Sequence, residues 1–393
     1  MNTLVGVLGS PARAEVDARG RVRPLGSRGA FDWWIGADDR WRRFAVEAAV
    51  RQSRPGPAPV LETALRVPGG DAVQRVWGVG TAGGQIVVEF ENRSPAPFVV
   101  AAVVDTTDGP GPRRIELDGH VVRIDREPAL VVPGPVRRWA AGPQSAGDLF
   151  ATVEANGARS DAFVPIAVRR GEAVRAALLF AVPHRSRLRF AIPFHDADVV
   201  PAALPDAEES ARGWSAQLDR GMRVAVPDEG LQRAVDAARA EILLRDARDP
   251  YVVRALEDWG FDAEAAAGFL RLSLRDRRTA ARRDPAPDDP WRAAFAAALD
   301  DPLGLLAAVR AAVVHDGDDG GVTLLPTWPD EWRGQSLEVH DAPTRSGPVS
   351  YAIRWHGEHA ALIWDVTVPR ALRAPGLAPT WHTDAAVGEA LLV

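Results

Sequence analysis

The apolar residues of the first 204 positions occur in short runs that turn-forming residues separate. Four of these runs have the length of a β-strand, and Gly, Pro, Asn or Asp stands between them. They cover residues 86–90, 98–104, 174–182 and 188–192. The turn cluster at residues 92–97 predicts that the first two runs pair as a hairpin.

A second hairpin is predicted by Asp118-Gly119, a two-residue turn signal between the apolar segments 115–117 and 120–124. Helix signals are few in this part of the chain. Many short strands over about 200 residues are typical of a β-sandwich. We therefore predict a large N-terminal β-sandwich domain over residues 1–204.

Residues 205–315 change to a helical period. Asp228 can cap a helix in which apolar residues recur at helical spacing from Leu231 to Ile242. Three Asp-Pro pairs follow, and each places an N-cap acid before a proline at the first helical position. They are Asp249-Pro250, Asp289-Pro290 and Asp301-Pro302.

These caps predict two helical hairpins, near residues 250–276 and 290–314. Gly260 would end the first helix, and Asp262 would cap the next one. Residues 277–289 are charged and proline-rich, so we predict a loop between the hairpins. With a further helix near residues 206–220, the segment has space for about six helices, and we predict a short α/α-toroid-like helical-hairpin domain over residues 205–315.

Residues 316–393 return to a strand pattern. Residues 322–325 are predicted to form one strand. Residues 350–355 alternate between apolar and polar, turn at 356–359 and return as a second strand over 361–366. We predict a C-terminal β segment here, which makes the fold class multidomain β + α.

Composition excludes several kinds of chemistry. Cysteine is absent, which excludes disulfides, thiolate metal sites and a cysteine nucleophile. Lysine is also absent, so all 47 basic residues are arginine, and no phosphate-loop or Schiff-base lysine exists. The net charge of -6 does not indicate the basic surface that a nucleic-acid-binding protein usually has. We expect no cofactor and no metal.

Neither a membrane nor a secretory signal is indicated. No apolar stretch reaches the length of a membrane-spanning helix. The apolar residues near the N-terminus are too few for a signal peptide. We therefore expect a cytoplasmic protein that has no membrane partner.

Three short motifs favour structural roles. The glycines of Gly78-Val-Gly80-Thr-Ala-Gly83 precede a strand, whereas a dinucleotide site needs a helix there, so we predict a hairpin loop. The acidic segment 316–321 lacks two ligands of a calcium loop and is predicted to be a solvated connection. His356 and His359 fall in a predicted turn, which does not suit a helical metal pair.

Tryptophan is abundant, with 13 residues against 2 tyrosines. Several lie beside carboxylates, a combination that suits sugars because a ring face stacks on the sugar while acids accept its hydroxyl protons. The alternative is that the rings fill the core, as buried tryptophan usually does. The candidate substrate-binding residues are Trp33, Trp34, Asp38, Trp259, Trp328 and Trp332.

The order of a β-sandwich, a connecting helix over residues 208–220, helical hairpins and a terminal β segment resembles the glucoamylase-like, six-hairpin glycosidase superfamily. The junction at residues 224–231 is similar to that family, and segments 31–41, 62–71, 325–332 and 350–357 resemble an uncharacterised bacterial family related to it. The superfamily's toroid has twelve helices, so the resemblance implies an abbreviated helical domain here.

The resemblance implies acids on loops between toroid helices. An inverting glycosidase needs a protonated acid and a base carboxylate about 6.5–9.5 Å apart. Glu257, Asp258 and Asp262 surround the tip of the first helical hairpin beside Trp259, and they are the candidate catalytic residues. The alternative is that Asp262 caps a helix and that the other two acids are solvated near a helix end.

We therefore predict a carbohydrate-active protein of glycoside hydrolase ancestry whose glycosidic-bond hydrolysis is weak or lost. The alternative is a non-catalytic carbohydrate-binding or scaffold protein. The expected ligand is a neutral oligosaccharide, because the net charge disfavours polyanions unless local arginines override it.

Overall fold

The computed structural model describes residues 2–27, 29–106, 113–169, 172–282, 286–317 and 319–392. The chain divides into two compact units. Unit 1 comprises Met1–Pro55 and Pro59–Arg212, and unit 2 comprises Gly56–Ala58 and Gly213–Val393. The division near residue 212 falls inside helix α2 (Ala207–Leu218), and the predicted helical and C-terminal β segments share unit 2.

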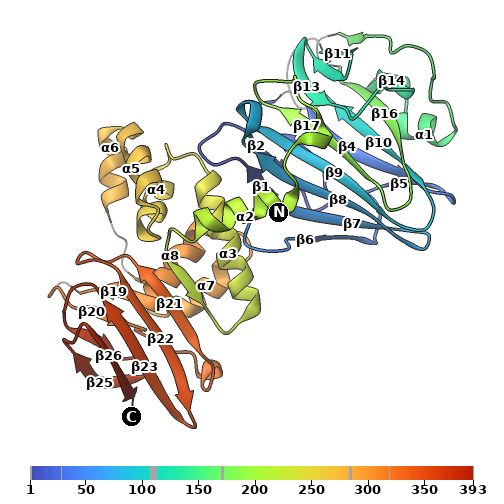
Figure 1. Ribbon diagram of the computed structural model, residues 1–393. Coiled ribbons are helices and arrows are strands. Elements are labelled where there is room, and N and C mark those ends of the chain that lie inside the picture. The colour runs from blue at the N-terminus through green and yellow to red at the C-terminus, as the bar shows by residue number, and fades with distance from the viewer. Residues whose placement is uncertain are drawn as a thin grey trace. The chain divides into compact units, whose positions relative to one another are not determined.

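Unit 1 is built from two antiparallel sheets (Figure 1). The first has the order β1-β2-β3-β4-β10-β16-β14, with β5 paired to β4, and the second has the order β15-β11-β12-β13-β17-β9-β8-β7-β6. The strands are β1 (Thr3–Gly6), β2 (Arg13–Val16), β3 (Val22–Pro24), β4 (Ala30–Gly36), β5 (Trp41–Arg43), β6 (Val50–Ser53), β7 (Leu61–Val67), β8 (Gly70–Val79), β9 (Gln85–Arg93), β10 (Phe98–Asp105), β11 (Arg113–Asp118), β12 (Val121–Ile124), β13 (Glu127–Val131), β14 (Arg138–Pro143), β15 (Ile166–Val168), β16 (Val174–Val182) and β17 (Arg187–Pro193).

The two sheets enclose one apolar core. Alternate side chains of each sheet point into it, so that Trp33 of β4 contacts Phe90 and Phe190 of the other sheet at ring-centroid distances of 5.0 and 5.2 Å. A second apolar cluster lies on the outer face of the first sheet, where Trp34 packs with Leu149 and other residues of helix α1 (Leu149–Glu154).

The predicted hairpin between residues 86–90 and 98–104 is wrong. Strand β9 pairs with β8 and β17, whereas β10 pairs with β4 and β16, so the two runs belong to opposite sheets. Both runs bury apolar side chains in the same core, and they meet face to face across it. The segment between them is therefore an arch that crosses the core and not a turn within one sheet.

Buried Asn92 organises this arch. Its Nδ2 donates to the carbonyl oxygens of Ala96 and Val182 at 2.9 and 3.0 Å, and its Oδ1 accepts from the backbone N–H of Ser94 at 2.9 Å. Val182 ends β16, which also crosses to the second sheet, where the chain continues as β17. One amide side chain thus joins two neighbouring arches.

Two other predictions for unit 1 are confirmed. Strands β11 and β12 form the second hairpin with Asp118 opposite Val121, so Gly119 and His120 occupy the turn, one position later than predicted. The glycine motif lies in the β8–β9 hairpin loop, which contains the short helix η1 (Thr81–Gly83).

The outer face of the second sheet carries a row of alternating charges. Glu62, Arg75, Glu89 and Arg189 stand opposite one another on β7, β8, β9 and β17. Glu89 is buried, and its oxygens lie 3.3 Å from Arg75 Nη1 and 2.6 Å from Arg189 Nε. Each charge has opposite charges as cross-strand neighbours, which is the favourable arrangement for a sheet face.

Replacing Glu89 with Gln should destabilise this sheet by about 3 kcal/mol, because removing one member of a buried ion pair leaves its partners uncompensated. Hydrogen–deuterium exchange of β8, β9 and β17 measures the loss. The exposed carboxylate Glu127 provides the control, and Glu127→Gln should change stability by less than about 0.5 kcal/mol. Equal exchange in the two variants would contradict the structural role of the charge row.

Unit 2 contains helices and two smaller sheets, with the orders β18-β21-β22-β23-β26 and β19-β20-β24-β25. Its helices after α2 are α3 (Glu229–Leu244), α4 (Pro250–Asp258), α5 (Asp262–Arg271), α6 (Leu274–Ala281), α7 (Pro290–Ala297) and α8 (Pro302–Val313). Its strands are β18 (Arg223–Ala225), β19 (Val314–Asp316), β20 (Val322–Leu324), β21 (Leu337–Ala342), β22 (Val349–His356), β23 (His359–Val366), β24 (Leu372–Ala374), β25 (Ala378–Thr383) and β26 (Val387–Leu392).

Most predicted caps are confirmed. The side chains of four aspartates accept a backbone N–H in the first turn of α3, α4, α7 and α8; they are Asp228, Asp249, Asp289 and Asp301. The prediction for Asp262 is wrong, because Phe261 occupies the N-cap position and Asp262 is the first helical residue. Gly260 follows α4 with a φ of 75°, which permits the chain to reverse.

The helical segment differs from the prediction in one connection. The pairs α4–α5 and α7–α8 pack together as predicted. Residues 277–289 were predicted to be a loop, but α6 extends to Ala281, because Ser273 caps it by accepting from Asp276 N at 3.2 Å. Residues 283–285 lie outside the described residues. Over the described part of the segment, α2 to α8 make seven helices where about six were predicted, and a toroid stays a prediction.

The C-terminal strands agree with the sequence pattern. Strands β22 and β23 form the predicted hairpin, with His356 opposite His359 and the turn between them. Of segment 316–321, Asp316 ends β19 and residue 318 lies outside the described residues. Among the helices of the described ranges, none combines the length and the apolar character that crossing a membrane requires.

Candidate functional site

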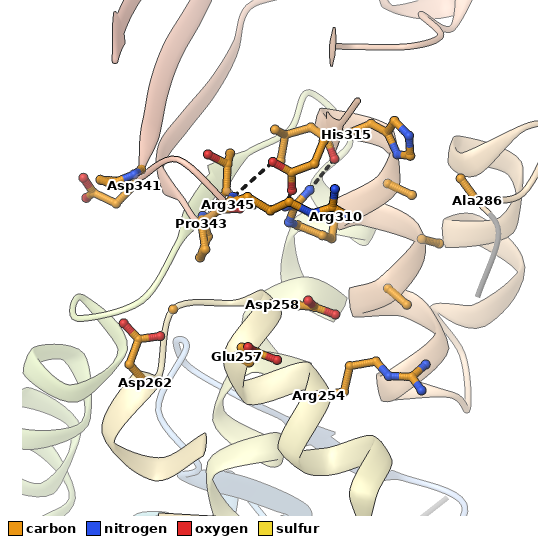
Figure 2. A pocket seen from close by; sticks show the side chains of 18 of the residues that line it. Arg254, Glu257, Asp258, Asp262, Ala286, Arg310, His315, Asp341, Pro343 and Arg345 are labelled. Carbon is orange, nitrogen blue, oxygen red and sulfur yellow. Dashed lines mark hydrogen bonds and ion pairs between the residues drawn. The ribbon is translucent and has the colours of Figure 1, made fainter. Parts of the chain in front are cut away.

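A pocket of about 830 Å³ lies in unit 2 (Figure 2). Four elements contribute most of its lining: the C-terminal end of α4, helix α8, strand β19 and the loop of residues 343–348 that follows β21. We call this loop the rim loop. The three candidate catalytic residues Glu257, Asp258 and Asp262 all line the pocket.

The acids occupy one side of the pocket. Glu257 and Asp258 are the last two residues of α4, and Asp262 begins α5 after the reversal at Gly260. Figure 2 shows Glu257 and Asp258 near each other, with Asp262 beyond the α4–α5 turn. Glu257 and Asp262 are exposed, and Asp258 is half-buried.

Trp259 fixes the end of α4. Its ring is fully buried, and its Nε1 donates to the carbonyl oxygen of Leu306 in α8 at 3.1 Å. Its own carbonyl oxygen accepts from the N–H of Met222 at 2.8 Å. The two acids that precede Trp259 are therefore held against α8, which forms the floor of the pocket.

Small residues on α8 leave the space for the pocket. Gly304, Ala307, Ala308 and Ala311 line it and recur at helical spacing on one face of α8. Larger side chains at these positions would fill the cavity. The floor is therefore apolar, while the walls are charged.

Arg310 connects the floor to the opposite wall. Its Nη2 donates to the carbonyl oxygen of Pro343 at 2.6 Å and lies 3.4 Å from Asp316 Oδ2, and its Nη1 donates to the carbonyl oxygen of Val314. Asp316 Oδ1 in turn accepts the backbone N–H of Arg345 at 3.1 Å. The guanidinium and the carboxylate together fasten the rim loop to β19.

A second arginine holds the rim loop from its other side. Arg370 is buried, and it donates to Thr344 Oγ1 at 2.7 Å and to the carbonyl oxygen of Ser346 at 2.9 Å. Its Nε donates to the carbonyl oxygen of Val368 at 2.9 Å. Polar groups of the rim loop are thus satisfied by two arginines that come from different parts of unit 2.

Buried Tyr351 supports the junction of α8 and β19. Its hydroxyl donates to the carbonyl oxygen of Val313 at 2.7 Å. Burial raises the pKa of Tyr351 well above its ordinary value, so the hydroxyl stays protonated and remains a donor.

Two further pocket arginines, Arg254 and Arg220, bind protein groups. Arg254 Nη2 donates to the carbonyl oxygen of Thr279 at 2.5 Å, near the end of α6. Arg220 makes two parallel hydrogen bonds to Glu264, at 2.9 and 3.0 Å. On the opposite wall, Asp341 pairs with Arg223 at 3.0 Å.

The predicted aromatic platforms do not line the pocket. Trp33, Trp34 and Trp259 are buried, with exposed fractions of 1%, 4% and 0%, so no ring face is available for stacking. The prediction that these three rings bind a substrate is wrong for this reason, and the core alternative describes them. Asp38 is exposed and lies after β4 of unit 1.

Trp328 and Trp332 belong to a separate aromatic cluster. Trp332 is buried against Trp291 with ring centroids 4.6 Å apart, and Trp328 contacts both Trp332 and Trp355 at 6.2 Å. Neither residue lines the pocket. A role for half-buried Trp328 in binding stays a prediction, whereas Trp332 packs the interior.

Sequence reasoning missed the residues of the wall opposite the acids. They come from α8, β19, β21 and the rim loop, and their positions depend on tertiary contacts: Arg310, His315, Asp316, Asp341 and Arg345. The prolines that bound the rim loop, at 343 and 348, are the one local signal that marked it. Three or more metal-binding side chains come together nowhere in the described ranges.

Neither a protein-family model nor a curated protein matches the chain. The pocket therefore has to be interpreted from its own residues.

Asp32, which lies beside the buried tryptophans of unit 1, predicts that the stability of this unit depends on pH. Burial raises the pKa of Asp32 above its ordinary value of 3.8, although the N–H of Trp33 and the charge of Arg21 lower it. The folded state therefore binds the proton more tightly than the unfolded state. As the pH rises from below 3.8 through the raised pKa, unit 1 should lose stability.

Asp32→Asn should raise the thermal unfolding midpoint at pH 7, because a half-buried charge is removed. The gain should disappear near pH 3, where the aspartate is protonated in both states. Asp38→Asn, at an exposed site of the same unit, should leave the midpoint unchanged at either pH. A gain for Asp32→Asn that is independent of pH would show that ionisation is not its cause.

Proposed function

We propose that the chain is a carbohydrate-active protein of glycoside hydrolase ancestry and that the unit 2 pocket is its saccharide site. The observation that carries the proposal is that Glu257, Asp258 and Asp262 line one pocket of about 830 Å³. This volume lies within the usual range of ligand pockets. Carboxylates and arginines of its lining can supply acceptors and donors for sugar hydroxyls.

The chemical hypothesis assigns proton transfer to the end of α4. Glu257 would protonate the leaving oxygen of a glycosidic bond, and Asp258 would activate the attacking water. The anchoring of Trp259 supports this assignment, because positioned acids need a rigid helix end. The resemblance of the β, helical and β segments to the six-hairpin glycosidases supports the ancestry.

Saccharide binding without hydrolysis is the second candidate, and the exposure of Glu257 favours it. Hydrolytic sites exclude water from the reacting groups, and an exposed acid has no such enclosure. Binding would then depend on hydrogen bonds from the pocket walls, since no tryptophan lines the pocket.

Calorimetric titration of the full chain with a panel of oligosaccharides tests binding, and product analysis of the same mixtures tests hydrolysis. Under the hydrolytic hypothesis, Glu257→Gln should lower turnover by at least about 100-fold, because it keeps the shape of the side chain and removes its ionisable proton. Asp258→Asn should have a similar effect. Binding should persist in both variants.

Glu358→Gln is the matched control, since Glu358 is an exposed carboxylate in the β22–β23 turn and does not line the pocket. Turnover that survives Glu257→Gln would remove Glu257 from the mechanism. Binding without turnover would select the second candidate. If the unaltered chain binds no sugar of the panel, the proposed function is wrong.

A further inference from the structure

The wall of the pocket opposite the acids is a fixed structure that presents cationic side chains. The rim loop is held by Arg310 through Pro343, by Asp316 through the N–H of Arg345, and by Arg370 through Thr344 and Ser346. These bonds use the backbone and Thr344. They leave the side chain of Arg345 itself uninvolved.

The acids of this wall are already neutralised. Asp316 is paired with Arg310 at 3.4 Å, and Asp341 with Arg223 at 3.0 Å. Arg345 and His315 are exposed, and their side chains have no hydrogen bond or ion pair with any residue that the structure describes. Among the described residues of this wall, the guanidinium of Arg345 therefore has no opposite charge bound to it, and His315 lies on the same side of the pocket in Figure 2.

The two sides of the pocket carry different charged groups, and Arg254 lies on the same side as the acids (Figure 2). Figure 2 shows Arg345 and His315 on one side of the pocket and Glu257 and Asp258 on the other. The acids also stand at the C-terminal end of α4, where the helix dipole is negative. An anionic group is therefore favoured near Arg345, so the pocket can orient a ligand that has one charged end.

We propose that Arg345 and His315 form an oxyanion subsite, so that the saccharide of the pocket is acidic and carries its carboxylate or sulfate against the rim loop. This inference rests on the proposed function and names its substrate class. A planar guanidinium binds such a group through two parallel hydrogen bonds. The local charge replaces the expectation of a neutral ligand that the net charge of -6 supported.

The rim loop is held in place before a ligand binds, and this favours selective binding at the subsite. The backbone that carries Arg345 is ordered before the ligand arrives, so binding does not have to order it. The hydroxyls and the glycosidic oxygen of the same sugar would then face Glu257 and Asp258 across the apolar floor of α8.

Calorimetry with four probes separates the alternatives: a glucuronic acid disaccharide, the matching glucose disaccharide, a glucose sulfate and inorganic sulfate. The acidic sugar should bind about tenfold more tightly than its neutral counterpart, since hydrogen bonds between charged groups contribute on this scale. Whether the glucuronate or the sulfate ester binds more tightly identifies the oxyanion. Arg345→Gln should reduce the preference for the acidic over the neutral disaccharide to about twofold or less.

Arg333→Gln is the matched control, because Arg333 is an exposed arginine of the same unit that does not line the pocket, and it should retain the full preference. Thermal unfolding shows that each variant is folded. Equal binding of the acidic and neutral disaccharides would overturn the subsite and leave the saccharide function standing. Inorganic sulfate that binds as tightly as the sugar sulfate, with no binding of the neutral disaccharide, would support the subsite and contradict the saccharide function.

Discussion

The guanidinium of Arg310 is the interaction on which the pocket depends. It lies where α8 ends, β19 begins and the rim loop returns, and it donates to a carbonyl oxygen from each side of this junction. Carbonyl groups at a helix end lack partners within the helix, and a cation there is also favoured by the helix dipole. The same side chain also pairs with one oxygen of Asp316. The other oxygen of that carboxylate accepts the backbone N–H of Arg345.

Arginine suits this position for a geometric reason. Its planar group has five donors in a fixed arrangement, whereas a lysine would place a single compact charge at the junction. The chain has no lysine, so a buried side chain with a permanent positive charge is always an arginine. Each such arginine has several N–H donors that need acceptors. Arg370 meets this requirement with three acceptors around the rim loop. The result is a surface loop whose backbone is bonded to two buried or half-buried arginines and one carboxylate.

Features that depend on neighbouring residues could be predicted from the sequence. The Asp-Pro caps, the β22–β23 hairpin and the glycine loop each need only a few consecutive residues. The candidate acids were found for the same reason, because a helix end and a glycine reversal bring them together locally. The partners of the rim loop could not be found in this way, since Asp316 and Arg370 are distant from it in sequence and no repeating pattern connects them.

The error at residues 92–97 has the same origin. A turn within one sheet and an arch between two sheets use the same residue types. What distinguishes the arch is a long-range contact, the hydrogen bond from the amide of Asn92 to the carbonyl oxygen of Val182. The tryptophans illustrate the opposite problem: composition indicated surface platforms, but the two sheets needed large side chains to fill the space between them.

The arches have a consequence for how unit 1 folds. At the arches, consecutive strands such as β9 and β10 do not pair. Strand β9 pairs instead with β17, and this register joins residues as far apart as Glu89 and Arg189. Closing such long loops costs chain entropy before any contact compensates for it. Unit 1 is thus a slow-folding topology in which both sheets assemble together. Until β17 arrives, the edge of β9 remains open to pairing with another chain.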